Sequence, residues 1–423
     1  MHFCQIRKFI SSTEIFCTIV LSTNERIYLD YAATTPVDPR VLKAMQESFQ
    51  YYGNSESTHG FGFDSHEQLQ RSRKLFAQSM NVHPREIVFT CGGTESDNIA
   101  TLGVTRKFMR DNPGVQPHII TSSIEHHAIW KSCEHLEKLG VKVTYVPVDA
   151  DGLVSVESIQ NSITKNTILI SIIHVQNELG TIQPIREIGS LAKDENILFH
   201  SDSTQAFGKL YIDPNQMNVD MFSASAHKLY GPKGVGLLYI KNSGRKTPID
   251  DWTAEEPEEK DYYVEPIMFG GGQENGIRPA TVNVQSIVGF AKAYEIMDEV
   301  RNEEMNRLRE YQQDLMSFVL SSIPDSRLNG HPTMRLATHN NFSFKDVNGF
   351  DILTELDQKG FAVSTGSACI AQSDDISHVI DALHLPKEYQ QGTLRISTGR
   401  FTTPDHIRKF KITLEETIKK IRK

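Results

Sequence analysis

The chain has 423 residues, and 44 basic against 53 acidic side chains give it a formal net charge of −9. This length is sufficient for roughly two or three domains. The negative charge disfavours direct binding of nucleic acid, which requires a basic surface. No apolar run approaches the roughly 18 residues that span a bilayer. We therefore expect neither nucleic acid nor a membrane as a partner.

The chain contains five scattered cysteines: Cys4, Cys17, Cys91, Cys133 and Cys369. Their odd number and the lack of a Cys-x-x-Cys pair argue against a disulfide framework and against a thiolate zinc site. We expect a cytoplasmic location and no metal centre. Residues 1–26 contain a short apolar stretch without a small-residue cleavage site, and are interpreted as an N-terminal extension of unknown role.

Regular patterns begin at Ile27–Tyr31, which predicts an N-terminal strand, and Val37–Tyr52 has the spacing of an amphipathic helix. From residue 86 onward, short apolar runs alternate with helical patterns. The predicted strands are Glu86–Cys91, His118–Ser122, Val141–Val146, Thr167–His174, Ile197–Asp202, Met221–Ala226 and Gly236–Ile240. The predicted helices between them include Glu95–Arg106, His127–Leu139, Val156–Ile163 and Ile185–Lys193. This alternation predicts an α/β fold with a mainly parallel, seven-stranded sheet covered by helices on both faces.

A long helical pattern over Val284–Ile323 leads into a second region. That region has predicted strands at Asn340–Phe344, Ala362–Ser364 and Leu394–Ser397, and predicted helices at Ser377–Leu383 and after Thr403. The large domain is expected over residues 37–283. The smaller α+β domain is expected to combine residues 27–36 and 284–423. The acidic stretch 250–261 is interpreted as a solvated surface loop, in preference to a docking surface for a basic partner.

Polar side chains follow five of the predicted strands, at the points where the strands end. They lie in the segments Cys91-Gly92-Gly93-Thr94, Ser123-Ile124-Glu125-His126, His174-Val175-Gln176-Asn177, Asp202-Ser203-Thr204-Gln205 and Ser225-Ala226-His227-Lys228. Ligands collect at the carboxyl ends of parallel strands. The sequence therefore predicts that these five segments converge on one site.

The types of residue in these segments indicate one cofactor. A lysine such as Lys228, placed in a tight loop after a strand, can attack a carbonyl group. Gly93 and Thr94 open a helix whose backbone amides suit a phosphate, and Ser225 and His227 supply further donors. Asp202 at a strand end can keep an aromatic ring nitrogen protonated. An amine, a phosphate cradle and a carboxylate for a pyridine nitrogen together indicate pyridoxal 5′-phosphate.

The sequence resembles the cysteine desulfurases of the NifS/IscS-like group, within the class V pyridoxal-phosphate enzymes of fold type I. The resemblance extends from about Ile27 to the C-terminus. It is carried by the segments Leu29-Asp30-Tyr31-Ala32-Ala33-Thr34-Thr35-Pro36, Phe89-Thr90-Cys91-Gly92-Gly93-Thr94-Glu95-Ser96-Asp97-Asn98, Glu125-His126, Gln176-Asn177-Glu178-Leu179-Gly180, His227-Lys228-Leu229-Tyr230-Gly231-Pro232-Lys233-Gly234, Gly270-Gly271-Gly272-Gln273-Glu274 and Gly366-Ser367-Ala368-Cys369.

The resemblance implies a role for each residue that matches these motifs. Lys228 would bind the cofactor as a Schiff base and later move the α proton. His126 would stack on the cofactor ring, Asp202 would pair with the ring nitrogen and Gln205 with the ring hydroxyl. The residues that would hold the phosphate are Gly93, Thr94, Ser225, His227 and, from a second subunit, Thr281.

The resemblance also implies a substrate and a nucleophile. Asn177 and Arg395 would bind the carboxylate of L-cysteine, for which a planar guanidinium is well suited. Cys369 would attack the substrate sulfur, which leaves L-alanine and a persulfide on the enzyme. Small and polar residues flank Cys369 on both sides, as an exposed thiol that hands sulfur on requires. The expected assembly is a homodimer that delivers sulfur to an acceptor protein.

Two alternatives remain at this stage. One is another class V activity, such as a selenocysteine lyase or an aminotransferase. The other is a catalytically idle scaffold that binds sulfur-transfer proteins. The destination of the sulfur is open between iron–sulfur clusters, thiolated tRNA and phosphorothioate DNA. The chain departs from the family pattern at Ala280, where glycine is usual before Thr281, and after Asn54, where proline is usual.

Overall fold

The computed structural model describes residues 26–241, 262–366 and 376–423. Its centre is a seven-stranded sheet with the order β2-β8-β7-β6-β5-β3-β4. The strands are β2 (Ile87–Thr90), β3 (His118–Ser122), β4 (Lys142–Val146), β5 (Thr167–Ser171), β6 (Leu198–Asp202), β7 (Met221–Ser225) and β8 (Gly236–Ile240). Only β8 runs against its neighbours, β2 and β7. The predicted fold class, a mainly parallel seven-stranded sheet in an α/β protein, is confirmed.

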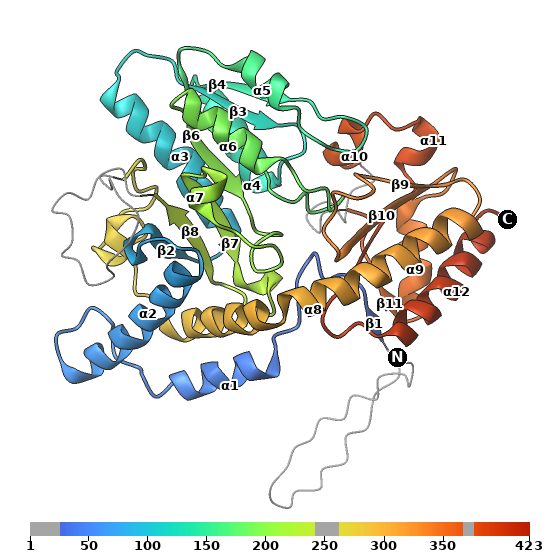
Figure 1. Ribbon diagram of the computed structural model, residues 1–423, viewed down its shortest axis with the longest axis horizontal. Helices are drawn as coiled ribbons and strands as arrows, with labels where there is room; N and C mark the ends of the chain where they lie inside the picture. Colours follow the sequence, from blue (N-terminus) through green and yellow to red (C-terminus); the bar gives the residue numbers. More distant parts are fainter. Residues whose placement is uncertain (1–25, 242–261, 367–375) are drawn as a thin grey trace, which may run out of the picture.

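Helices cover both faces of this sheet (Figure 1). Helices α3 (Gly93–Asp111) and α4 (His127–Lys138) enclose one apolar core with residues such as Ile99, Ile119 and Ile129. On the other face, α2 (Gly60–Ser79), α5 (Val156–Ser162) and α6 (Ile185–Asp194) enclose a second core around Phe76 and Phe199. The short helices α1 (Pro39–Ser48) and α7 (Pro214–Met217) complete this part of the molecule.

A second, smaller part of the molecule contains two further sheets. Strands β9 (Ser326–Leu328), β10 (His339–Phe344) and β12 (Thr393–Ser397) form an antiparallel sheet. The N-terminal strand β1 (Ile27–Tyr28) pairs in parallel with β11 (Phe361–Ala362). Helices α9 (Gly349–Gln358) and α12 (Pro404–Ile421) pack on these strands around Phe342, Leu394 and Phe410. Helices α10 (His378–Ala382) and α11 (Lys387–Gln390) lie in the same part.

The 39-residue helix α8 (Val284–Ser322) runs through both parts (Figure 1). Its first turns contribute Ile287 and Phe290 to the core of the large sheet, whereas Leu315 and Val319 belong to the core of the smaller part. A domain boundary at residue 283 therefore stays a prediction, because the helix that follows it is shared. Within the described residues, no helix combines the length and the hydrophobicity needed to cross a bilayer.

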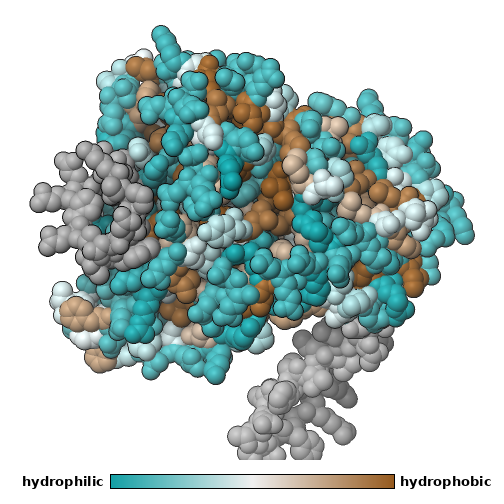
Figure 2. Space-filling model, viewed as in Figure 1, coloured by the Kyte–Doolittle hydropathy of each residue, from teal (hydrophilic) through white to brown (hydrophobic). Residues whose placement is uncertain are grey.

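The two parts meet along an apolar boundary. Helix α10 and the residue that follows it place Val379, Ile380 and Leu383 against Ile124 and Leu179, which follow strands of the large sheet region. Figure 2 shows hydrophobic residues gathered along this boundary. The contact brings the residues that flank segment 367–375 next to the ends of the central strands.

Candidate active site

The carboxyl ends of the central strands open onto one cavity of about 260 Å³. Ten of the twelve residues predicted for the site line this cavity: Gly93, Thr94, His126, Asn177, Asp202, Gln205, Ser225, His227, Lys228 and Arg395. The two others are not among its walls. Thr281 is exposed, and Cys369 lies outside the described residues. The structure thus brings together side chains that are far apart in the sequence, as expected for strand ends.

Lys228 is the last residue of a single 3₁₀ turn, Ala226–Lys228, which directly follows β7. Its Nζ donates hydrogen bonds to the backbone oxygens of Ala32 and Ala33, at 2.6 and 2.7 Å. The chain just beyond these two residues also fixes the turn, because Thr35 N donates to the oxygen of His227 at 2.9 Å. The N-terminal segment therefore aims the Lys228 amine into the cavity.

Asp202 is the last residue of β6 and is 4% exposed. Its Oδ1 accepts a hydrogen bond from the backbone N–H of Thr204 at 2.9 Å. Gln205, one turn further along the chain, donates from Nε2 to the Ala32 oxygen at 2.9 Å. The two side chains project from the same strand end, so an acid and an amide face the cavity together with the Lys228 amine.

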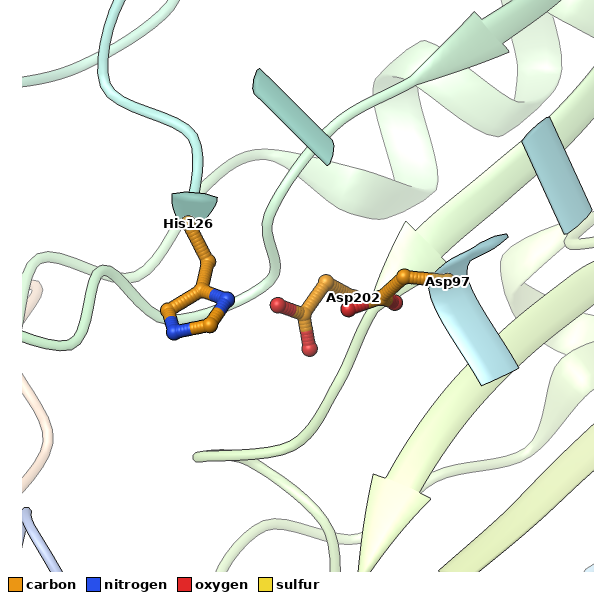
Figure 3. A group of neighbouring side chains, drawn as sticks. All are labelled: Asp97, His126 and Asp202. Carbon is orange, nitrogen blue, oxygen red and sulfur yellow. The ribbon is translucent and has the colours of Figure 1, made fainter. Parts of the chain in front are cut away.

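Asp97, His126 and Asp202 form a close group on one wall of the cavity (Figure 3). One nitrogen or oxygen atom from each lies within 4.8 Å of the others. Burial and the nearby Asp202 raise the pKa of Asp97 well above its usual range. A protonated carboxyl is a poor metal ligand, so this spacing alone does not indicate a metal site. The expectation of no metal stays a prediction.

His126 caps helix α4 and is held as a neutral ring. Its Nδ1 accepts the backbone N–H of Ala128 at 3.1 Å, which assigns the ring hydrogen of the neutral form to Nε2. Burial lowers the pKa of His126, and the attraction of Asp202 opposes this only in part. A flat, uncharged imidazole next to a buried carboxylate is well suited to lie against an aromatic ring.

The start of helix α3 forms another part of the cavity wall. Its N-cap residue is Gly92, which has no side chain to accept a hydrogen bond from the first amides of the helix. A Cβ atom on Gly93 would lie 2.7 Å from the Thr204 Oγ1, so the backbone approaches its neighbour more closely than a larger residue permits. The uncapped amides, with Thr94, Ser225 and His227 beside them, form a cradle for an anion.

Arg395 on β12 is 1% exposed and reaches the cavity from the smaller part of the molecule. Its Nη2 donates to Asp30 Oδ1 at 2.8 Å and its Nη1 donates to the Asn177 oxygen at 3.1 Å. Its Nε is buried and has no hydrogen-bond partner among the described residues. A carboxylate ligand would supply the acceptor that this guanidinium lacks.

The prediction from sequence missed two side chains of this site. Asp97 is one helical turn beyond Gly93, so its spacing within α3 was a usable sign that it faces the same cavity. Asp30 pairs with Arg395, which is 365 residues away, and nothing in the local sequence indicates that pairing.

A family model for class-V aminotransferases matches residues 27–410. The chain belongs to this family. Among curated class-V relatives, the cysteine desulfurase IscS of Dictyoglomus turgidum is 40% identical over 397 residues, which cover 94% of this chain and 95% of the relative. The mitosomal cysteine desulfurase of Trachipleistophora hominis is 39% identical over 406 residues, covering 95% of this chain and 88% of the relative.

Solved structures of class-V enzymes agree with this assignment. A NifS-like protein matches with a TM-score of 0.82 and 33% identity, covering 93% of this chain and 99% of its own. A structure described as SspA in complex with cysteine matches with a TM-score of 0.74 and 34% identity, covering 89% and 99%. The predicted resemblance to NifS/IscS-like cysteine desulfurases is confirmed. Enzymes of this class depend on pyridoxal phosphate, which is the cofactor that the sequence predicts.

Proposed function

We propose that this protein is a cysteine desulfurase, which converts L-cysteine into L-alanine and retains the sulfur as a persulfide on Cys369. The observation that carries the proposal is one cavity whose lining includes Lys228, Asp202 and Arg395. The cysteine desulfurases among its relatives support the same reaction.

The cavity fits pyridoxal phosphate by the chemistry of its walls. The uncapped end of α3, with Thr94 and Ser225, supplies donors for the phosphate. Asp202 supplies a buried carboxylate for the ring nitrogen, and Gln205 supplies an amide for the ring hydroxyl. The closely packed Gly93 leaves room that a side chain would fill. When bound, the cofactor supplies an electron sink for the carbon that bears the substrate amine.

The residues of the chain would bind the substrate and move its protons. Arg395, with its unpartnered Nε, and Asn177 would hold the carboxylate of L-cysteine. The Lys228 amine would take the α proton, because it is the amine that reaches into the cavity. The neutral His126 ring would lie against the cofactor.

The sulfur would leave by nucleophilic attack. The Cys369 thiolate would form an S–S bond to the substrate sulfur while the Cβ–S bond breaks. The electron pair of that bond would remain on the carbon side, which takes up a proton and becomes alanine. The residues at the two ends of segment 367–375 support this role. A Cβ on Gly366 would lie 3.1 Å from Glu178 Oε2, and Ser377 Oγ donates to the same oxygen at 2.8 Å. Glu178 follows Asn177 of the cavity wall directly.

A homodimer is part of the proposal. Large aromatic side chains of α2 and of the connection that precedes it, together with Phe269, are more than half exposed: Phe49, Tyr52, Phe61, Phe63 and Phe269. Tyr52 and Phe61 lie side by side, with ring centroids 5.3 Å apart, and exposed aromatic groups of this kind often mark an interface. Thr281 is exposed and is not part of the cavity of its own chain. Both observations favour a second copy, to which Thr281 would contribute. We further propose a cytoplasmic protein that passes the persulfide sulfur to an acceptor protein.

The test is to incubate the cofactor-loaded protein with L-cysteine and a thiol reductant and to measure alanine and sulfide. Equal amounts of both products are expected, together with a shift of the visible absorption band when cysteine is added. Cys369→Ser is expected to abolish sulfide release and to keep the absorption shift. Full activity of that variant on cysteine would favour a lyase or aminotransferase. A protein without a cysteine-dependent absorption change would refute the proposal and favour a scaffold.

A further inference from the structure

Lys209 is a second lysine close to the site, and it is 5% exposed. It does not line the cavity. Within the part of the chain that the structure describes, it takes part in no ion pair, and its Nζ donates to Gln205 Oε1 at 3.2 Å. A buried amine without an acidic partner is costly, and an apolar side chain of similar length would avoid that cost. The position therefore calls for an explanation in terms of the amine itself.

Local backbone geometry directs Lys209 onto Gln205. Two consecutive turns, in which Lys209 N and Leu210 N both donate to the Ala206 oxygen, bring residues 205 and 209 onto the same side. The Gln205 amide then bridges two groups, because Oε1 accepts from Lys209 and Nε2 donates to the Ala32 oxygen. The same Ala32 oxygen accepts the hydrogen bond of Lys228 Nζ. A continuous chain of hydrogen bonds thus connects the two lysines.

We propose that Lys209 is a positioning residue for the cofactor site, which fixes the Gln205 amide with Nε2 toward the cavity and disfavours a positive charge on Lys228. A protonated amine has three donors and no acceptor, so only the carbonyl end of Gln205 can face it. Two positive charges near each other each resist protonation, which favours the nucleophilic, uncharged form of an amine. The inference rests on the proposed function, because it concerns the binding of pyridoxal phosphate.

The Lys209 amine gains or loses its proton near neutral pH. Burial, together with the nearby Lys228, lowers the pKa of Lys209 to about 7, and the carboxylate of Glu304 on α8 opposes this in part. His227 and His339 also face it, and burial keeps the pKa of each of them low, so both rings are neutral at pH 7. With these rings uncharged, Lys228 is the basic side chain and Glu304 the acidic side chain that act on the Lys209 amine.

The experiment compares wild type with Lys209→Met, Lys209→Arg and, as control, Lys193→Met on the exposed end of α6. The first readout is the pH midpoint of the visible absorption band of the protein loaded with pyridoxal phosphate, which reports protonation at the Lys228 nitrogen. Removal of the neighbouring charge is expected to raise this midpoint by at least about half a unit in Lys209→Met. Lys209→Arg, which stays charged, is expected to keep it low.

The second readout is the dissociation constant of pyridoxal phosphate from the apoprotein between pH 6 and 9. We expect roughly tenfold weaker binding in Lys209→Met, because the Gln205 amide loses its fixed orientation. Binding by wild type should weaken above pH 7, whereas the arginine variant should show a flatter profile. A folded Lys209→Met protein with the wild-type midpoint and affinity would overturn the inference. A wild-type protein that does not bind the cofactor would instead refute the proposed function.

Discussion

Glu274, in the Gly-Gly-Gly-Gln-Glu motif, forms a buried acid–guanidinium pair in the large sheet region, and its removal is a strong test of the structure. Its carboxylate accepts from Arg73 Nη2 at 2.6 Å and from Arg73 Nη1 at 3.0 Å, and also from the backbone N–H of Phe89 at 2.8 Å. The Arg73 and Glu274 side chains are only 9% and 3% exposed. Glu274 therefore ties the segment before Thr281 to helix α2 and strand β2.

The expected cost of Glu274→Gln follows from this geometry. Loss of one partner of a buried ion pair costs about 3–5 kcal/mol, because the other charge stays buried without compensation. Glutamine keeps one acceptor oxygen, so we expect about 3 kcal/mol. The double variant Arg73→Met, Glu274→Leu leaves no unpaired charge, and it is expected to lose less stability than the single variant.

The measurement is the free energy of unfolding from urea titrations of the cofactor-loaded protein. The matched control is Glu67→Gln on α2, the helix that carries Arg73. Glu67 makes an exposed ion pair with Arg71 at 2.6 Å. Exposed i,i+4 pairs contribute only about 0.3–0.5 kcal/mol. If Glu274→Gln costs no more than Glu67→Gln, or if the double variant is less stable than the single one, the reasoning about this buried pair is wrong.

Three further predictions concern single substitutions. Arg395→Lys should raise the KM for cysteine roughly tenfold or more with a smaller change in kcat, because a lysine cannot keep the contacts to Asp30 and Asn177 while it binds a carboxylate; an unchanged KM in steady-state assays would contradict this. Ala280 has a φ of +97°, so Ala280→Gly should stabilise the protein by about 1 kcal/mol in urea unfolding, and a loss of stability would contradict the strained backbone. Burial raises the pKa of Glu125 from 4.5 to about 8. Between these values the folded state holds a proton that the unfolded chain has lost, so stability falls as pH rises through this window. Glu125→Gln removes this decline, so the stability of the variant relative to wild type should rise by up to about 1.4 kcal/mol per pH unit from pH 5 to 8. A stability difference between the two proteins that stays constant over this range would contradict the raised pKa of Glu125.

Most strands of the large sheet could be predicted because they are buried runs between turns, and the exception is β4, where only Val146 is fully buried. Strands β2, β3 and β7, for example, are buried at every position. The predicted strand Thr167–His174 is too long, because β5 ends at Ser171 while the chain continues beside β6 through single hydrogen bonds from Ile172 and His174. The alternation of strands and helices then predicts that most strands run parallel, and therefore at which edge of the sheet the site lies.

Helix α2 shows what the local pattern conceals. The prediction assigned no element to Gly60–Ser79, because its buried positions include glycine, serine and arginine and do not form an apolar stripe. Arg73 is buried next to Glu274, a carboxylate partner that comes 201 residues later in the chain. The same limit applies to Asp30, whose role depends on Arg395, 365 residues later in the chain. Periodicity reports burial of apolar groups, whereas pairs of buried polar groups depend on the finished fold.

The segment from Asp30 to Thr35 explains why the two parts of the molecule can share one site. Its Ala32 and Ala33 oxygens accept from Lys228, which follows a strand of the large sheet. Its Asp30 carboxylate pairs with Arg395, which belongs to the smaller sheet. The amine that would take the α proton and the guanidinium that would bind the carboxylate are therefore positioned by the same short stretch of backbone. Their separation is set by the short turn over residues 30–33 rather than by the long helix α8, so movement between the two parts need not change the geometry in which the substrate is held.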